Sequence, residues 1–144
     1  LHDMIREKGL EDCVEMLGAM PPEEVRRHME KADIYLFTSD FNEGWGAVLN
    51  ESMNSGCAVV ASHAIGSVPF LIKNGENGLI YENGNQLDLE KQVLRLLEDG
   101  AFRKKIAENA YETMINLWNA ETAAERFLTL TEKLLKTKIR ILYF

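Results

Sequence analysis

The chain has 144 residues, of which 46% are hydrophobic and 27% charged, and its formal net charge is −7. This composition is ordinary for a soluble globular domain with a core of its own, and the acidic balance argues against nucleic acid as a partner. No apolar run approaches the roughly 20 residues that span a bilayer. The mixed charge of residues 1–10 also argues against a signal peptide.

Helical and strand-like patterns alternate over the first eighty residues. Capping glycines, a Pro-Pro-Glu-Glu opening and apolar spacing predict helices at 1–8, from Pro21 to Ala32, 45–55 and 68–73. Short apolar runs predict strands at 13–17, Ile34–Phe37, 57–61 and Leu79–Tyr81. The run at 57–61 is apolar almost throughout, which is typical of a parallel strand buried on both faces.

Beyond residue 85 the pattern is helical. Three apolar stripes are expected to face the core: Leu89, Val93, Leu96 and Leu97; Phe102, Ile106, Ala110 and Met114; and Ala123, Phe127, Leu130 and Leu134, with Asn119 as cap of the last helix. Residues 136–144 end basic and then apolar. The sequence leaves open whether the tail at 138–144 is an edge strand, a docked tail or a segment foreign to the protein.

Alternating strands and helices predict an α/β fold, with a parallel sheet between two layers of helices. The sheet is expected within about 13–82 and the helical part within about 88–137, in one partial domain that covers 1–144. Doubly wound domains normally begin with a strand and have five or six of them. We therefore expect the N-terminal part of the domain to be missing, and the exposed edge or sheet face to drive self-association.

The two cysteines, Cys13 and Cys57, lie in apolar runs and are expected to be buried, reduced thiols. Cysteine and histidine show no metal-ligand spacing, so no metal site is expected. Reduced thiols favour a cytoplasmic location.

The most informative block runs from Ile34 to Met53, where an apolar strand enters a polar loop and then turns through Gly44 and Gly46 into a helix. Glu43 precedes the turn and Glu51 lies on the helix. Backbone N–H groups at a helix start can bind phosphate, and carboxylates can bind sugar hydroxyls. From Asp33 to Glu90 the chain has eight acidic residues and one basic residue, Lys73. A bound diphosphate would therefore depend on backbone amides or on a cation from elsewhere.

Each of these features also has a purely structural interpretation. The Glu-x7-Glu spacing occurs five times in the chain, so only its setting distinguishes Glu43 and Glu51. Glu43 could cap a loop, Glu51 could be a solvated helix residue, and the glycines could serve turn geometry alone. Asn50 could lie on the helix surface, and Ser62 and His63 could form a polar loop without a ligand.

Three segments together resemble the signature of retaining GT-B glycosyltransferases, the group 1 family: Glu43-Gly44-Trp45-Gly46, Leu49-Asn50-Glu51-Ser52-Met53 and 56–62. Residues 14–18, 66–69, 74–80 and Trp118 resemble the flanking segments, so the match covers about 1–135. The resemblance implies the Rossmann-like C-terminal domain of such an enzyme, truncated at its N-terminus, with a nucleotide-diphosphate sugar as donor and no further cofactor.

The resemblance also implies roles for individual residues. Glu43, the catalytic candidate, would contact donor sugar hydroxyls, and Glu51 would accept hydrogen bonds from the ribose. Gly18 and Met20 would lie near the base. Main-chain N–H groups would bind the diphosphate, and they come from Gly44, Trp45, Gly46, Ala47 and Val48. The implied reaction is hexosyl transfer with retention, for example in surface polysaccharide synthesis, in the cytoplasm or at the inner face of the membrane. The acceptor (sugar, lipid or protein) would bind a separate N-terminal domain.

The chain departs from the family pattern at three places: it lacks the upstream Arg/Lys pair and the acceptor domain, and Phe70 stands where the family often has Glu. The loop at 39–43 is also a residue longer than usual. The first two departures predict that this chain alone is inactive, and they keep open a non-catalytic α/β module that binds a nucleotide or a protein. A flavodoxin-like receiver fits poorly, because no acidic pair follows a first strand.

Overall fold

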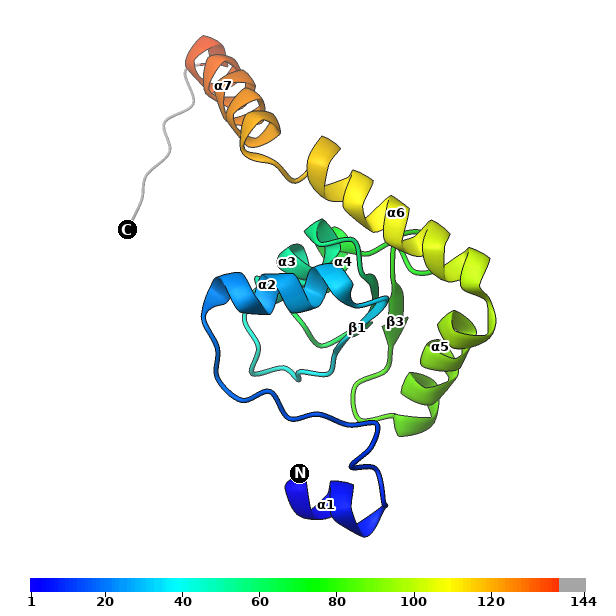
Figure 1. The fold of residues 1–144 in the computed structure, drawn as a ribbon. Coiled ribbons are helices and arrows are strands. Elements are labelled where there is room, and N and C mark those ends of the chain that lie inside the picture. The colour runs from blue at the N-terminus through cyan, green and yellow to red at the C-terminus, as the bar shows by residue number, and fades with distance from the viewer. Residues whose placement is uncertain (138–144) are drawn as a thin grey trace.

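The computed structural model describes residues 1–137. At its centre lies a parallel sheet of three strands, in the order β1 (Ile34–Phe37), β2 (Ala58–Ser62) and β3 (Leu79–Tyr81) (Figure 1). Ile34 is paired with Ala58, and Val60 with Leu79. The central strand is buried along its whole length, as its nearly continuous apolar run predicts.

Successive side chains of β2 point to opposite faces of the sheet, so the strand contributes to two separate cores. Val59 and Ala61 face α2 (Pro22–Lys31), α3 (Val48–Asn54) and α4 (Val68–Leu71). This core is completed by buried side chains from those helices and from the end of α6 (Gly100–Asn116): Met29, Leu49, Met53, Val68, Leu71, Ala110 and Met114.

Ala58 and Val60 face the opposite core, which is covered by α5 (Gln86–Glu98) and the first part of α6. Leu96 and Ile106 are fully buried there. Both helices begin at an acidic or amide cap, since Asn85 Oδ1 accepts from the Asp88 N–H at 3.0 Å and Asp99 Oδ1 from the Phe102 N–H at 2.8 Å. The expected three-layer α/β fold is confirmed.

The strand expected at 13–17 is wrong. After α1 (His2–Glu7), this segment runs as coil, and Val14, Met16 and Leu17 are 39–45% exposed. A strand needs a neighbour to pair its backbone groups, and within residues 1–137 no strand pairs with 13–17. The sheet therefore has three strands among the described residues. The expected burial of Cys13 is wrong for the same reason, since it lies in this exposed segment, whereas Cys57 is buried as expected.

The last described helix, α7 (Ala120–Thr137), begins where expected, since Asn119 Oδ1 accepts from the Thr122 N–H at 2.8 Å. The expectation that its stripe faces the core is wrong. Phe127 is 69% and Leu130 54% exposed, because α7 extends away from the sheet (Figure 1). Ala123 is exposed as well. No helix within residues 1–137 is both long enough and apolar enough to cross a membrane, and the tail at 138–144 lies outside the described residues.

Two helices are shorter than expected at the edge that carries the candidate site. The predicted helix at 45–55 begins only at Val48, since residues 45–47 form the turn before it. The predicted helix at 68–73 ends at Leu71, because Ile72 is extended with φ −104° and ψ 125°.

Candidate functional site

Two loops meet at the carboxyl edge of the sheet, where the ligand crevices of open parallel sheets form. Residues 38–47 follow β1, and residues 63–67 follow β2. The Gly66 N–H donates to the Gly44 carbonyl at 3.0 Å, and the Ser67 N–H donates to the Trp45 carbonyl at 3.0 Å. These two hydrogen bonds hold the turn that precedes α3 against the loop after β2.

Two glycines make this close approach possible. A Cβ atom at Gly66 would collide with the carbonyl oxygen of Gly44. Gly46 has φ +74°, and a Cβ atom there would lie 2.8 Å from the Phe37 ring and 2.9 Å from Ile65 Cγ2. Glycine is therefore required at both positions by contact, and at Gly46 by backbone conformation too.

The turn leads into α3 with a row of backbone N–H groups that have no partner in the described chain. None of the N–H groups from Gly44 to Val48 donates a hydrogen bond to another group of residues 1–137. Unpaired N–H groups at a helix start are natural donors to an anion such as phosphate. Their position agrees with the role that the sequence predicts for them.

Glu43 is half-buried in the loop just before these groups. Its Oε2 accepts from the Ser39 hydroxyl at 3.4 Å, while its own N–H donates to the Asp40 carbonyl at 3.0 Å. The loop is tightened further because Asp40 Oδ1 accepts from the Asn42 N–H at 2.8 Å. Glu43 Oε1 has no hydrogen-bond partner among residues 1–137, so it can accept from a ligand hydroxyl.

Glu51 lies on the exposed side of α3 and lines a hollow of about 570 Å³ between α2 and α3. Met20 lines the same hollow, so the structure brings together two residues to which the family resemblance gives roles at the ribose and the base. Gly18 does not line this hollow and lies in exposed coil with φ +71°. A volume of this size is typical of a small-molecule site.

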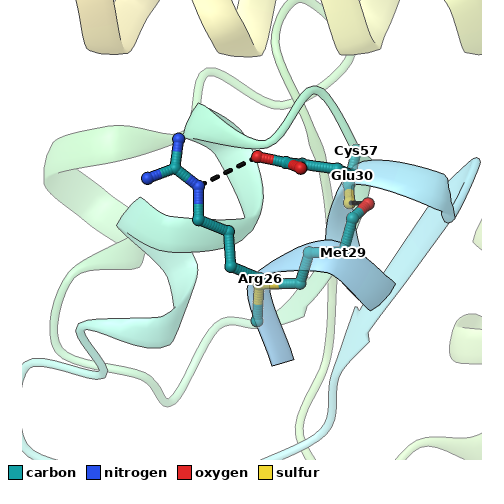
Figure 2. Close-up of polar contacts among 4 residues, drawn as sticks. All are labelled: Arg26, Met29, Glu30 and Cys57. Carbon is teal, nitrogen blue, oxygen red and sulfur yellow. Dashed lines mark hydrogen bonds and ion pairs between the residues drawn. The ribbon is translucent and has the colours of Figure 1, made fainter. Parts of the chain in front are cut away.

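The sequence prediction missed Arg26, which also lines this hollow. Its Nε donates to Glu30 Oε1 at 2.9 Å, and one turn of α2 separates the two residues (Figure 2). The same view shows how α2 is anchored, since the Cys57 thiol donates to the Met29 carbonyl at 3.1 Å. Charged residues on an outer helix face normally indicate only solvation, so sequence spacing had no signal for Arg26.

Trp45 has a side-chain role that the sequence prediction did not assign. Its Nε1 donates to Asn50 Oδ1 at 2.9 Å. Its ring contacts those of Phe70 and Trp118 at centroid distances of 5.7 and 5.8 Å. These contacts join the turn, α4 and the α6–α7 connection through the indole.

At the end of β2, His63 accepts a hydrogen bond at Nδ1 from the Asn83 N–H at 2.9 Å. In the neutral ring the proton is then on Nε2. The Phe41 ring packs edge-on against the imidazole at 5.6 Å, and Ser62 Oγ lies 3.3 Å from Asn83 Oδ1. These contacts explain His63 and Ser62 as parts of the loop framework.

Cys57, which directly precedes β2, is not a candidate nucleophile. Burial raises the pKa of the Cys57 thiol, and the carboxylate of Asp33 raises it further, so the thiol stays protonated and unreactive. Within residues 1–137 no group of three or more His, Cys, Asp or Glu side chains could hold a metal ion.

The comparison with protein families is specific. The sequence profile of the family described as glycosyl transferases group 1 matches residues 1–113. The chain belongs to this family. It is 35% identical over 106 residues to the amylovoran biosynthesis glycosyltransferase AmsK of Erwinia amylovora, covering 70% of this chain and 26% of AmsK. It is 33% identical over 111 residues to the D-inositol 3-phosphate glycosyltransferase of Corynebacterium aurimucosum, covering 77% and 26% of the two chains. This chain thus spans about a quarter of the length of these relatives.

Solved structures agree on the fold. The C-terminal domain of the group 1 family protein LpcC of Francisella tularensis is similar with a TM-score of 0.75 and 28% identity, covering 83% of this chain and 60% of that one. Anabaena HepE in complex with UDP is similar with a TM-score of 0.79 and 28% identity, covering 92% and 36%. The chain therefore has the Rossmann-like fold of GT-B C-terminal domains.

Proposed function

We propose that this chain is the donor-binding part of a glycosyltransferase that moves a hexose from a nucleotide-diphosphate sugar to an acceptor. The observation that carries the proposal is the combination of unpaired N–H groups at 44–48 with Glu43 before them and Glu51 after them. Membership of the group 1 family and the similarity to HepE, whose structure contains UDP, support it.

Each part of the donor has a counterpart in the site. The N–H groups of Gly44, Trp45, Gly46, Ala47 and Val48 would donate to the diphosphate. Glu51 would accept from both ribose hydroxyls, an arrangement that suits the two oxygens of a carboxylate. The base would occupy the hollow beside Met20. Glu43, through its unpaired Oε1, would accept from donor sugar hydroxyls.

The proposed chemistry is departure of the diphosphate from the sugar carbon, with retention of configuration at that carbon. Positive charge develops on the sugar and negative charge on the leaving group, so fixed N–H donors at the diphosphate lower the barrier. Glu43 would stabilise the cationic sugar by its negative charge. The proposal includes no metal or cofactor besides the nucleotide sugar.

The acceptor side belongs to a part of the protein beyond this chain. We propose that an N-terminal domain binds the acceptor, and that this chain alone binds the donor without transferring it. We further propose a role in surface polysaccharide synthesis, in the cytoplasm or at the inner face of the membrane. The similarity to AmsK, a glycosyltransferase of amylovoran biosynthesis, supports the biosynthetic role.

Binding of uridine, guanosine and adenosine diphosphate sugars, followed by ligand-detected NMR, tests the donor site. We expect a saturation-transfer signal for one nucleotide and at least a tenfold weaker affinity in Glu51→Ala, since two charge-assisted hydrogen bonds are lost.

The matched control is Glu90→Ala. Glu90 is an exposed helix carboxylate that belongs to two other Glu-x7-Glu pairs of the chain. Equal affinities in the protein, Glu51→Ala and Glu90→Ala would show that the site assignment is wrong. In the intact enzyme, transfer that survives Glu43→Ala would favour a non-catalytic role for this carboxylate.

A further inference from the structure

The hollow between α2 and α3 is lined by charged side chains of both signs. Among the described residues that line it, Arg26 alone is cationic, while Glu23 and Glu51 are acidic. The hollow therefore combines the charged donors of Arg26, and the neutral donors of Asn54 and Ser55, with a carboxylate already proposed for the ribose. It is the place in this chain where a base next to that ribose would meet a side-chain donor.

The order of ligand parts follows from the order of groups along α3. The unpaired N–H groups lie at the start of the helix, and Glu51 lies about one turn later. A diphosphate at the helix start and a ribose at Glu51 leave the base on the far side of the ribose. Beyond Glu51 along the chain, Asn54 and Ser55 line the hollow together with Met20 and Arg26, so we place the base there.

The terminal N–H groups of Arg26 are available to a ligand. Among residues 1–137 only its Nε has a hydrogen-bond partner, Glu30 Oε1, and Figure 2 shows the two terminal nitrogens directed away from that carboxylate. The pair is open to solvent, with side chains 66% and 47% exposed. Exposed ion pairs contribute little, so Arg26 can adjust toward a ligand at small cost.

The backbone beneath Arg26 is nevertheless fixed. Met29, one turn further along α2, is 5% exposed in the core, and its carbonyl accepts from the buried Cys57 thiol at 3.1 Å. Val25, next to Arg26, packs against the same core. The guanidinium is therefore an exposed group on a helix whose backbone is held by the core, and it lines the hollow while it keeps its Glu30 contact.

We propose that Arg26 determines base specificity by donating from its terminal N–H groups to a carbonyl oxygen of the base. Uracil and guanine have such oxygens, whereas adenine has none: its acceptors are ring nitrogens, and its exocyclic amino group cannot accept from arginine. The inference rests on the proposed donor site and names what that site selects, namely a nucleoside diphosphate with a carbonyl-bearing base.

Calorimetric titration with UDP, GDP and ADP tests this assignment on the chain itself. We expect UDP or GDP to bind at least tenfold more tightly than ADP. Arg26→Gln should weaken the preferred nucleotide about tenfold and leave ADP unchanged, because one charge-assisted hydrogen-bonding group is lost. Arg26→Lys should behave like Arg26→Gln, since a lysine lacks the planar fork of donors.

Arg27→Gln is the matched control, because Arg27 is the next residue of α2, is exposed and does not line the hollow. Glu30→Gln releases Arg26 and should bind the preferred nucleotide at least as tightly as the unaltered protein. Circular dichroism should show the same helix content in all variants, since the altered side chains lie on the surface.

Three results would overturn the assignment. Unchanged UDP and GDP affinity in Arg26→Gln would show that Arg26 does not contact the base, while the donor site would stand. Equal weakening of all three nucleotides would place Arg26 at the phosphates instead. No binding of any nucleotide by the unaltered protein would contradict the donor site itself, and the role of Arg26 with it.

Discussion

At the scale of single residues, the site depends on a few contacts that admit one residue type. Gly66 is the sharpest case, because a side chain there would meet the carbonyl oxygen of Gly44. Its N–H donates to that same oxygen at 3.0 Å. The hydrogen bond and the absence of a Cβ atom are therefore two parts of one requirement.

We predict that Gly66→Ala lowers the free energy of unfolding by about 1–3 kcal/mol, the usual cost of forcing extra volume into a packed region. It should also weaken nucleotide binding, since the turn at 44–46 must move. Urea denaturation and UDP titration measure the two effects.

Gly100→Ala is the control for this substitution. Gly100 begins α6, and the nearest atom to a Cβ there is 3.8 Å away. Alanine in a helix is favoured over glycine by up to about 1 kcal/mol, so this variant should be as stable as the unaltered protein or more so. A Gly66→Ala protein with an unchanged urea midpoint would contradict the steric argument.

Single-residue features could be predicted from the sequence where they depend only on neighbouring residues in the chain. Asn119 signalled a helix cap, and the cap is present. The close approach of a ligand to Gly44 and Gly46 stays a prediction. Arg26 was missed because its place in the hollow depends on how α2 packs against α3. Spacing along the chain carries no information about that packing.

At the scale of elements, apolar runs predicted which segments can be strands, but not which of them find a partner. The strands at Ile34–Phe37 and Leu79–Tyr81 were correct, since both pair with a central strand. The run at 13–17 has similar composition and stays coil within residues 1–137, because no neighbouring strand pairs with its backbone. Periodicity likewise predicted α7 as a helix without showing whether its apolar stripe is covered.

The exposed stripe of α7, with Phe127 and Leu130, leads to a prediction about association. Apolar surface of this kind favours contact with another molecule. We predict that the average mass of this chain rises with concentration in sedimentation experiments, and that Phe127→Glu with Leu130→Glu shifts it toward monomer.

Leu87→Glu serves as the control for association, because Leu87 is 78% exposed but lies on α5, away from the stripe. A chain that remains monomeric at every concentration would contradict the prediction. Association that persists in the double α7 variant would assign it instead to another surface, such as the outer edge of β1.

At the scale of the whole molecule, the packing of helices on the sheet positions the loops at the carboxyl edge of the sheet. β2 is buried on both faces and fixes the loops that follow β1 and β2 relative to one another. The helices α2 and α3 pack on one face and enclose the hollow that contains Met20, Arg26 and Glu51. The proposed donor site rests on this placement of the N–H donors at 44–48, the Glu51 carboxylate and the hollow.

The most direct measurement of this alignment is the chemical-shift change of each backbone amide in the ¹H–¹⁵N spectrum as UDP is added. Our account predicts that the largest changes fall at residues 44–48, with further changes at Met20, Arg26 and Glu51. Changes confined to other parts of the surface, or none at saturating UDP, would contradict the proposal that this edge of the sheet binds the sugar donor.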